Sequence, residues 1–173
     1  MNDIGTFTKR LGEVGTLREA GKYDAALARV EEMLKRWPAN AHLHVLLAKL
    51  VQLSDEPTRT LDDAKRALQH AAELDARSPA AAIELGYFLD NVEDNPQAAA
   101  KAFAQGVSAA RHLLIDALLG HTAALIQLDK RDEAVRSLLD ALHLADADRS
   151  SRKEPFTTRI DELLVELGQM QSA

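Results

Sequence analysis

Apolar residues recur every three or four positions along most of the chain, which is the spacing of amphipathic helices. Valine, isoleucine and threonine do not form runs, so no stretch has the composition of a β-strand. The clearest helical stripe lies near the C-terminus and consists of Phe156, Ile160, Leu163, Leu164, Leu167 and Met170. This pattern predicts an all-α fold.

Capping residues indicate where these helices begin and end. Ser78-Pro79 and Asn95-Pro96 each place a capping residue before a proline at the first helical position. Residues 60–63, Thr-Leu-Asp-Asp, resemble a capping box in which aspartate replaces glutamate. We therefore expect nine helices, at about 4–20, 23–36, 41–54, 61–76, 79–91, 96–110, 113–128, 132–146 and 155–170, with a charged linker at 147–154.

Two helical motifs repeat with nearly the same period. In the first, an alanine is followed by a large apolar residue four positions later and by a small or flexible residue after three more. Its copies are Ala26/Val30/Met33, Ala64/Leu68/Ala71, Ala99/Phe103/Gly106 and Ala134/Leu138/Ala141, with alanines 38, 35 and 35 residues apart. The second motif is a leucine before a small residue, and its copies are Leu47-Ala48, Leu85-Gly86 and Leu119-Gly120. Because small residues let helix backbones approach closely, the two motifs predict a stacked array of helix pairs.

These motifs resemble the tetratricopeptide repeat, a helical hairpin with Leu-Gly in its first helix and Ala and Phe in its second. The third copy matches best, through Leu85, Gly86, Ala99 and Phe103, and the first copy has Pro38 where the family's repeat ends. The resemblance implies a right-handed solenoid of helical hairpins that forms a single domain. The expected divisions are a domain over residues 1–173, repeats at about 7–40, 41–78, 79–111 and 112–147, and a capping helix at about 155–170.

Composition and charge narrow the classes of partner. Apolar residues make up 46% of the chain and aromatic residues only 4%, so alanine and leucine fill most of the core. The net charge of −6 argues against nucleic-acid binding, which depends on clustered lysine and arginine. The N-terminus lacks the features of a signal peptide, and no apolar stretch approaches the ~20 residues that span a bilayer. We expect a cytoplasmic protein that binds neither nucleic acid nor membrane.

No set of side chains forms a recognisable catalytic or metal motif. The chain has no cysteine, which excludes disulfides and thiolate metal sites. It also lacks a glycine-rich phosphate loop and a nucleophile elbow. None of the six histidines has a zinc-ligand spacing: His42, His44, His70, His112, His121 and His143. We therefore expect no enzymatic activity, no cofactor and no metal. We interpret Trp37 as packed under a turn between repeats, with an exposed anchor for a partner as the alternative.

In the tetratricopeptide family the first helix of each repeat lines a concave groove, and the resemblance implies the same here. The residues that would face the groove are His42, Val45, Lys49, Gln52, Ile83, Tyr87, Asp90, Asn91 and His121, with Leu114 and Ala117 on the turns before His121. Such a mixed surface suits a peptide, held either extended or as an amphipathic helix. The alternative is that several of these side chains pack between helices.

The leading functional hypothesis is a scaffold or adaptor, a monomer or weak homodimer, that grips a segment of a protein partner. The two-carboxylate clamp of heat-shock adaptors is not matched, because its cationic positions fall on Val45, Leu114 and Leu118. A second hypothesis is a dedicated bacterial chaperone, or an immunity protein that neutralises one toxic or secreted protein. The layout of the chain, which is small, acidic and built from a few repeats, resembles that of secretion chaperones. A regulatory subunit of an enzyme is the third hypothesis.

Overall fold

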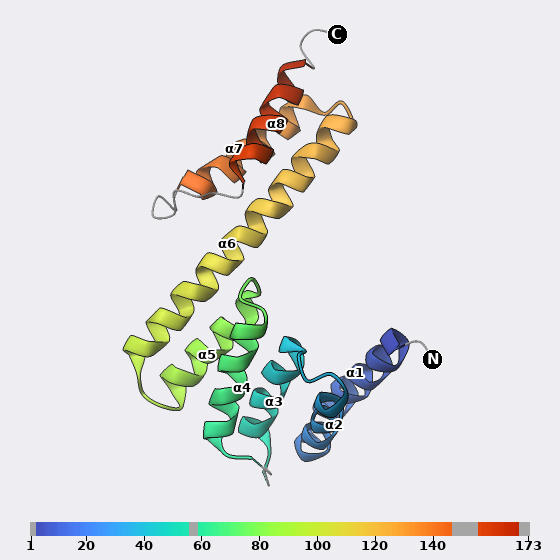
Figure 1. Ribbon diagram of the computed structural model, residues 1–173, viewed down its shortest axis with the longest axis vertical. Helices are drawn as coiled ribbons and strands as arrows, with labels where there is room; N and C mark the ends of the chain where they lie inside the picture. Colours follow the sequence, from blue (N-terminus) through green and yellow to red (C-terminus); the bar gives the residue numbers. More distant parts are fainter. Residues whose placement is uncertain (1–2, 56–58, 147–155, 170–173) are drawn as a thin grey trace. The chain divides into compact units, whose positions relative to one another are not determined.

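The computed structural model describes residues 3–55, 59–146 and 156–169 (Figure 1). These described residues form eight α-helices and no strand, which confirms the predicted all-α fold. The helices are α1 (Asp3–Glu19), α2 (Tyr23–Arg36), α3 (Ala41–Leu53), α4 (Leu61–Leu74), α5 (Pro79–Asn91), α6 (Pro96–Gln127), α7 (Arg131–Asp146) and α8 (Thr157–Gln169). None of them is long and apolar enough to cross a membrane.

The helices gather into two compact units, residues 1–108 and 109–173, and α6 contributes to both. In the first unit neighbouring helices pack in chain order from α1 to α5, and α3 also contacts α5. Figure 1 shows α3, α4 and α5 side by side. This is the stacking of helical hairpins that the repeated motifs predict. The single domain with four repeats stays a prediction.

Small residues lie at the helix contacts of the first unit, as their repetition predicts. Ala26, Ala48 and Ala64 are completely buried. A methyl side chain takes so little room that larger neighbours can close around it at the density of a normal protein interior. The largest of the fully buried side chains in this unit are Val14, Val30, Met33, Leu43, Leu50 and Leu68.

Local hydrogen bonds start the helices where the sequence predicts. The Asp63 amide donates to Thr60 Oγ1 at 3.2 Å and the Thr60 amide donates to Asp63 Oδ2 at 2.9 Å, which completes the expected capping box of α4. The bond from the Thr60 amide, followed by the one from Arg66, holds the pKa of the Asp63 carboxyl well below its usual range. Asn95 caps α6 by accepting from the Ala98 amide at 3.1 Å. Ser78 precedes Pro79 as predicted, but its side chain makes no capping bond.

The predicted break between helices at residues 110–113 is wrong, because α6 is one helix from Pro96 to Gln127. The break was expected from the period of the earlier repeats. Between Ser108 and Leu119, however, the chain has no glycine, proline or asparagine that would stop a helix. Local propensity therefore continues the helix through the position at which the repeat pattern places a turn.

In the second unit, α8 packs against α7, and its apolar stripe supplies much of the core. Four positions of the stripe, Phe156, Ile160, Leu163 and Leu167, are buried, whereas Leu164 is 49% exposed. Met170 and the predicted linker at 147–154 lie outside the described residues. The remaining buried residues of this core are Ile115, Leu119, Leu125, Ala134, Leu138, Ala141 and Ala145.

Candidate functional site

The first half of the predicted groove lies along one face of α3. His42, Val45, Lys49 and Gln52 are three or four residues apart, so their side chains follow one side of the helix. Val45 is only 7% exposed and belongs to the core, which fits the alternative reading that it packs between helices. His42 and Gln52 are exposed and Lys49 is half-buried, so these three polar residues remain accessible on α3.

An ion pair joins this face of α3 to α5. Lys49 Nζ donates to Glu84 Oε1 at 2.5 Å, and both side chains are partly exposed. The contact brings the first helices of two successive hairpins together, as the repeat pattern predicts. Glu84 was not among the predicted groove residues. Its position was detectable, because it lies 35 residues from Lys49, which is the period of the repeat.

On α5 the most exposed aromatic residue is Tyr87. Its side chain is 54% exposed, and its ring lies edge-to-face against Phe103 with centroids 5.1 Å apart. Gly86 makes this arrangement possible, because a Cβ there would lie 2.6 Å from Phe103 Cε1. Glycine therefore lets α5 approach the Phe103 ring closely, as the motif predicts, and Tyr87 projects beside the contact.

The other predicted residues of α5 differ in accessibility. Asp90 and Asn91 are exposed at the end of the helix, whereas Ile83 is half-buried. A Cβ on Gly106 would lie 2.8 Å from Ile83 Cγ1, so Ile83 packs against α6. We call the accessible surface of these two helices the α3–α5 face. It consists of His42, Lys49, Gln52, Glu84, Tyr87, Asp90 and Asn91.

His42 has an altered protonation equilibrium. Partial burial of its imidazole lowers the pKa below the usual value of 6.5, and the positive charges of Arg18 and Lys49 lower it further. Arg18 comes from the last turn of α1, so α1 also contributes charge beside the α3–α5 face. Sequence reasoning missed Arg18, although α1 has a copy of the leucine motif at Leu11-Gly12, 36 residues before Leu47.

His121 belongs to the second unit and is described there. It is exposed on α6, and its Nδ1 lies 3.3 Å from Ser137 Oγ on α7. Leu114 and Ala117 on the same helix are also exposed. The prediction of a close helix contact at Gly120 is wrong, because a Cβ there would meet no atom within 4 Å.

Two further features bear on possible sites. Trp37 is half-buried, its Nε1 donates to Asp3 Oδ2 at 3.2 Å, and its ring meets Phe7 edge-on, which supports the packed interpretation of this residue. In the described part of the chain, no three histidine, aspartate or glutamate side chains gather in a way that could hold a metal ion.

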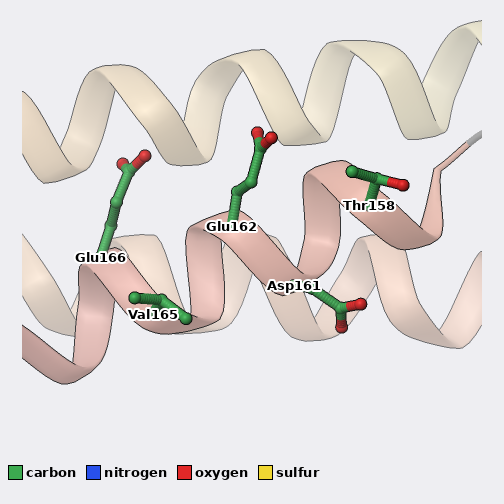
Figure 2. A pocket seen from close by; sticks show the side chains of 5 residues that line it. All are labelled: Thr158, Asp161, Glu162, Val165 and Glu166. Atoms are coloured by element: carbon green, nitrogen blue, oxygen red, sulfur yellow. The ribbon is translucent and has the colours of Figure 1, made fainter.

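A shallow hollow lies along one face of α8 (Figure 2). Figure 2 shows Glu162 and Glu166 pointing to the same side of the helix, with Asp161 directed away from them. Arg159 pairs with Glu162 at 2.9 Å and reaches Glu166 at 3.9 Å. The charge of this hollow is therefore partly neutralised by its own helix. The residues that line it are Thr158, Asp161, Glu162, Val165 and Glu166.

Comparison with known proteins gives limited similarity. No family model matches the chain. A 70-residue stretch is 34% identical to a Myxococcus xanthus protein described as an uncharacterized 18.1 kDa protein in the carS 3' region, and it spans 40% of this chain and 41% of that protein. Two crystal structures of MamA are similar with TM-scores of 0.49 and 0.48, at 18% and 17% identity. These comparisons cover 95% and 92% of this chain and 91% and 94% of the MamA chains.

Proposed function

We propose that this protein is a scaffold or adaptor that holds a segment of a partner protein against the α3–α5 face. The observation that carries the proposal is the pairing of Lys49 with Glu84 across two successive helices, beside an exposed tyrosine. The ion pair joins the two helices, and Tyr87 offers an aromatic ring that a partner would cover. Tyrosine is enriched among the residues that contribute most to protein–protein affinity.

The chemistry of the face suits a peptide better than a small molecule. Its groups are spread along two helices as hydrogen-bonding side chains and one aromatic ring, with the apolar Val45 already buried beneath them. Small-molecule sites are enclosed and mostly apolar, whereas extended or helical peptides are read by side chains distributed over a surface. The proposal therefore commits to a polypeptide partner.

Affinity capture with the full chain tests this proposal. We expect Tyr87→Ala and Asp90→Lys to weaken capture of the partner on the order of tenfold, as is typical for changes at the centre of an interface. Val107→Ala and Asp116→Lys are matched controls, because both residues are exposed on α6 and lie outside the α3–α5 face. Equal capture by all four variants, with unchanged thermal unfolding, would contradict the proposal.

A further inference from the structure

In the second unit, one face of α6 is apolar and exposed. Its residues follow one another at alternating steps of four and three, which is the spacing of a helix that packs lengthwise against another helix. All of them are exposed, Leu114 by 50% and Leu128 by 67%. We call this face the α6 stripe, and it consists of Ala110, Leu114, Ala117, His121, Ala124 and Leu128.

The α6 stripe carries almost no charge. Charged residues make up 28% of the chain, yet the only exposed charged residue between positions 110 and 128, all of which the structure describes, is Asp116. Leu113 borders the stripe and is exposed as well. Single exposed leucines are ordinary, but a continuous apolar strip is typical of a surface that another molecule covers.

The order of side-chain sizes along the α6 stripe matches a second copy of the same stripe. Large side chains lie seven residues apart, and alanines seven residues apart lie between them. In a parallel pair in register, large side chains would meet each other and alanines would meet each other, which leaves crowded and empty layers in turn. In an antiparallel pair, with the two-fold axis between positions 117 and 121, every layer joins one large side chain to one alanine. The three layers are Ala110 with Leu128, Leu114 with Ala124, and Ala117 with His121.

Gly120 lies at the centre of this antiparallel arrangement. It is exposed, and a Cβ there would meet no atom within 4 Å, so the backbone of α6 is open at this point. Because the two-fold axis passes between Ala117 and His121, the glycines of the two copies lie opposite each other. Small residues at the contact let two helices pack at the short end of the usual distance between helix axes.

The charges at the ends of the α6 stripe are complementary in the same arrangement. Arg111 lies beside the first position of the stripe and Asp129 beside the last. An antiparallel pair sets the first position of each copy against the last position of the other, so opposite charges meet at both ends, whereas a parallel pair would bring like charges together. Lys130, the residue after Asp129, is paired with Glu133 of its own chain at 3.1 Å.

We infer that the α6 stripe is the interface of a homodimer in which two copies of the second unit pack antiparallel along α6. Such an interface is isologous, because the same patch of both copies takes part. The stripe is about 27 Å long and about 10 Å wide, which is smaller than the ~800 Å² per partner of a standard stable interface. The dimer is therefore weak and reversible. The inference does not depend on the function proposed above, because the α3–α5 face belongs to the first unit.

Sedimentation equilibrium of the full chain tests the dimer. We expect a monomer at about 10 μM and a dimer at roughly 0.1–1 mM, as suits a small interface. Leu114→Glu should weaken the dimer about tenfold or more, because it places a carboxylate in the apolar seam. Leu139→Glu is the matched control: Leu139 is 47% exposed but lies on α7, outside the stripe, so the change should leave dimerisation unaltered. Circular dichroism of dilute samples checks that both variants are folded.

An exchange of side-chain sizes tests one layer without adding charge. Leu114→Ala removes the large side chain of the layer, and Ala124→Leu sets a second large side chain in it, so each change alone should weaken the dimer several-fold. The double variant again places one leucine opposite one alanine and should recover most of the loss.

Introduced cysteines test the direction of packing. The chain has no cysteine of its own, so no other thiol competes. A mixture of Ala110→Cys and Leu128→Cys should form a disulfide between the two variants. Ala110→Cys alone should not, because its two copies lie about 27 Å apart in the antiparallel dimer, and a disulfide spans at most about 7 Å between Cα atoms.

Several outcomes would overturn the inference. These are a chain that stays monomeric at about 1 mM, equal weakening by Leu114→Glu and Leu139→Glu, a double variant that recovers nothing, or a disulfide formed by Ala110→Cys alone. A monomeric chain that binds a helix of another protein along the stripe would overturn it as well. Tyr87→Ala and Asp90→Lys should leave the dimer unchanged, so failure of the dimer and failure of the proposed function are distinguishable.

Discussion

Leu85-Gly86 in the first unit and Leu119-Gly120 in the second have the same sequence motif and different surroundings. A Cβ on Gly86 would lie 2.6 Å from Phe103 Cε1, whereas a Cβ on Gly120 would meet nothing within 4 Å. In the first unit the following helix presents an aromatic ring to the glycine. In the second unit, the corresponding large residue of the alanine motif is Leu138, which is buried with Leu119 in the core. A glycine marks a close helix contact only when a bulky group lies opposite it.

The helices that carry these two glycines also begin at different distances from the motif. Pro79 starts α5 and Pro96 starts α6, so a turn separates Gly86 from Phe103. Gly120 lies on the same unbroken helix as Phe103, because α6 continues to Gln127. The motif is therefore repeated in the sequence, whereas the turn that should precede it is not. Substitutions that alter the continuity of α6, the packing at each glycine, or the contact between α6 and α7 distinguish the effect of the glycine's neighbours from the effect of the missing turn.

The largest effect is expected for Ala110→Pro. Ala110 is exposed in the interior of α6, and proline there removes a helical hydrogen bond and clashes with the preceding turn. We expect a loss of about 3 kcal/mol or more in the free energy of unfolding, measured by urea denaturation and circular dichroism. Ala110→Gly is the control and should cost about 1 kcal/mol. If proline costs no more than glycine, the chain turns near residue 111 as the repeat period predicts, and the continuous α6 is contradicted.

Smaller changes in the free energy of unfolding, of opposite sign, are expected when Gly86 and Gly120 are each replaced by alanine. Gly86→Ala places a methyl group against the Phe103 ring and should destabilise the fold by about 1–3 kcal/mol, the usual range for overpacking. Gly120→Ala meets open space and should stabilise the fold by roughly 0.5–1 kcal/mol, because alanine loses less backbone entropy in a helix.

The same pair of sites offers an internal check on the cause. Phe103→Leu should recover part of the cost of Gly86→Ala, because the two side chains are in contact and their effects are coupled. It should not alter the effect of Gly120→Ala. Destabilisation of equal size at Gly86 and Gly120 would show that the two glycines share one role, and the comparison between the units would fail.

Much of this fold was predictable because its determinants are local. The capping box of Thr60 and Asp63 and the prolines at the starts of α5 and α6 were read directly from neighbouring residues. The continuity of α6 was missed because the period of the earlier repeats was given more weight than the absence of any helix-breaking residue between Ser108 and Leu119. Periodicity describes what repeats and cannot indicate where the repetition stops.

The candidate site was less predictable, because it depends on contacts between helices. Helical spacing placed Lys49 and Tyr87 on accessible surfaces but could not show that Val45, one turn before Lys49, is buried. Glu84 was identifiable only by comparing charges one repeat period apart. Arg18 carries no motif, and its relevance comes from its effect on the pKa of His42. Sequence pattern thus predicts which face of a helix is used, and packing decides which residues on that face stay accessible.

The smallest change in the free energy of unfolding is expected for a hydrogen bond between α6 and α7, in the unit where Gly120 makes no close helix contact. Ser137 Oγ of α7 donates to the Leu118 carbonyl of α6 at 3.1 Å, and Thr122 Oγ1 donates to the same oxygen at 2.8 Å. Ser137→Ala removes this bond and the contact with His121 Nδ1 while Thr122 still satisfies the carbonyl, so we expect a loss of about 0.5–1.5 kcal/mol.

Thr122→Val is the matched control, because it removes a bond within α6 and leaves the link to α7 in place. Hydrogen exchange of the α7 amides provides the readout: protection should fall in Ser137→Ala and remain in Thr122→Val, since only the first change loosens α7 from α6. If both variants lose protection equally, the hydroxyl pair acts on α6 alone. The contact between α6 and α7 would then depend on the apolar core around Leu119 and Leu138, and the second unit would differ from the first only in the size of the side chains that fill it.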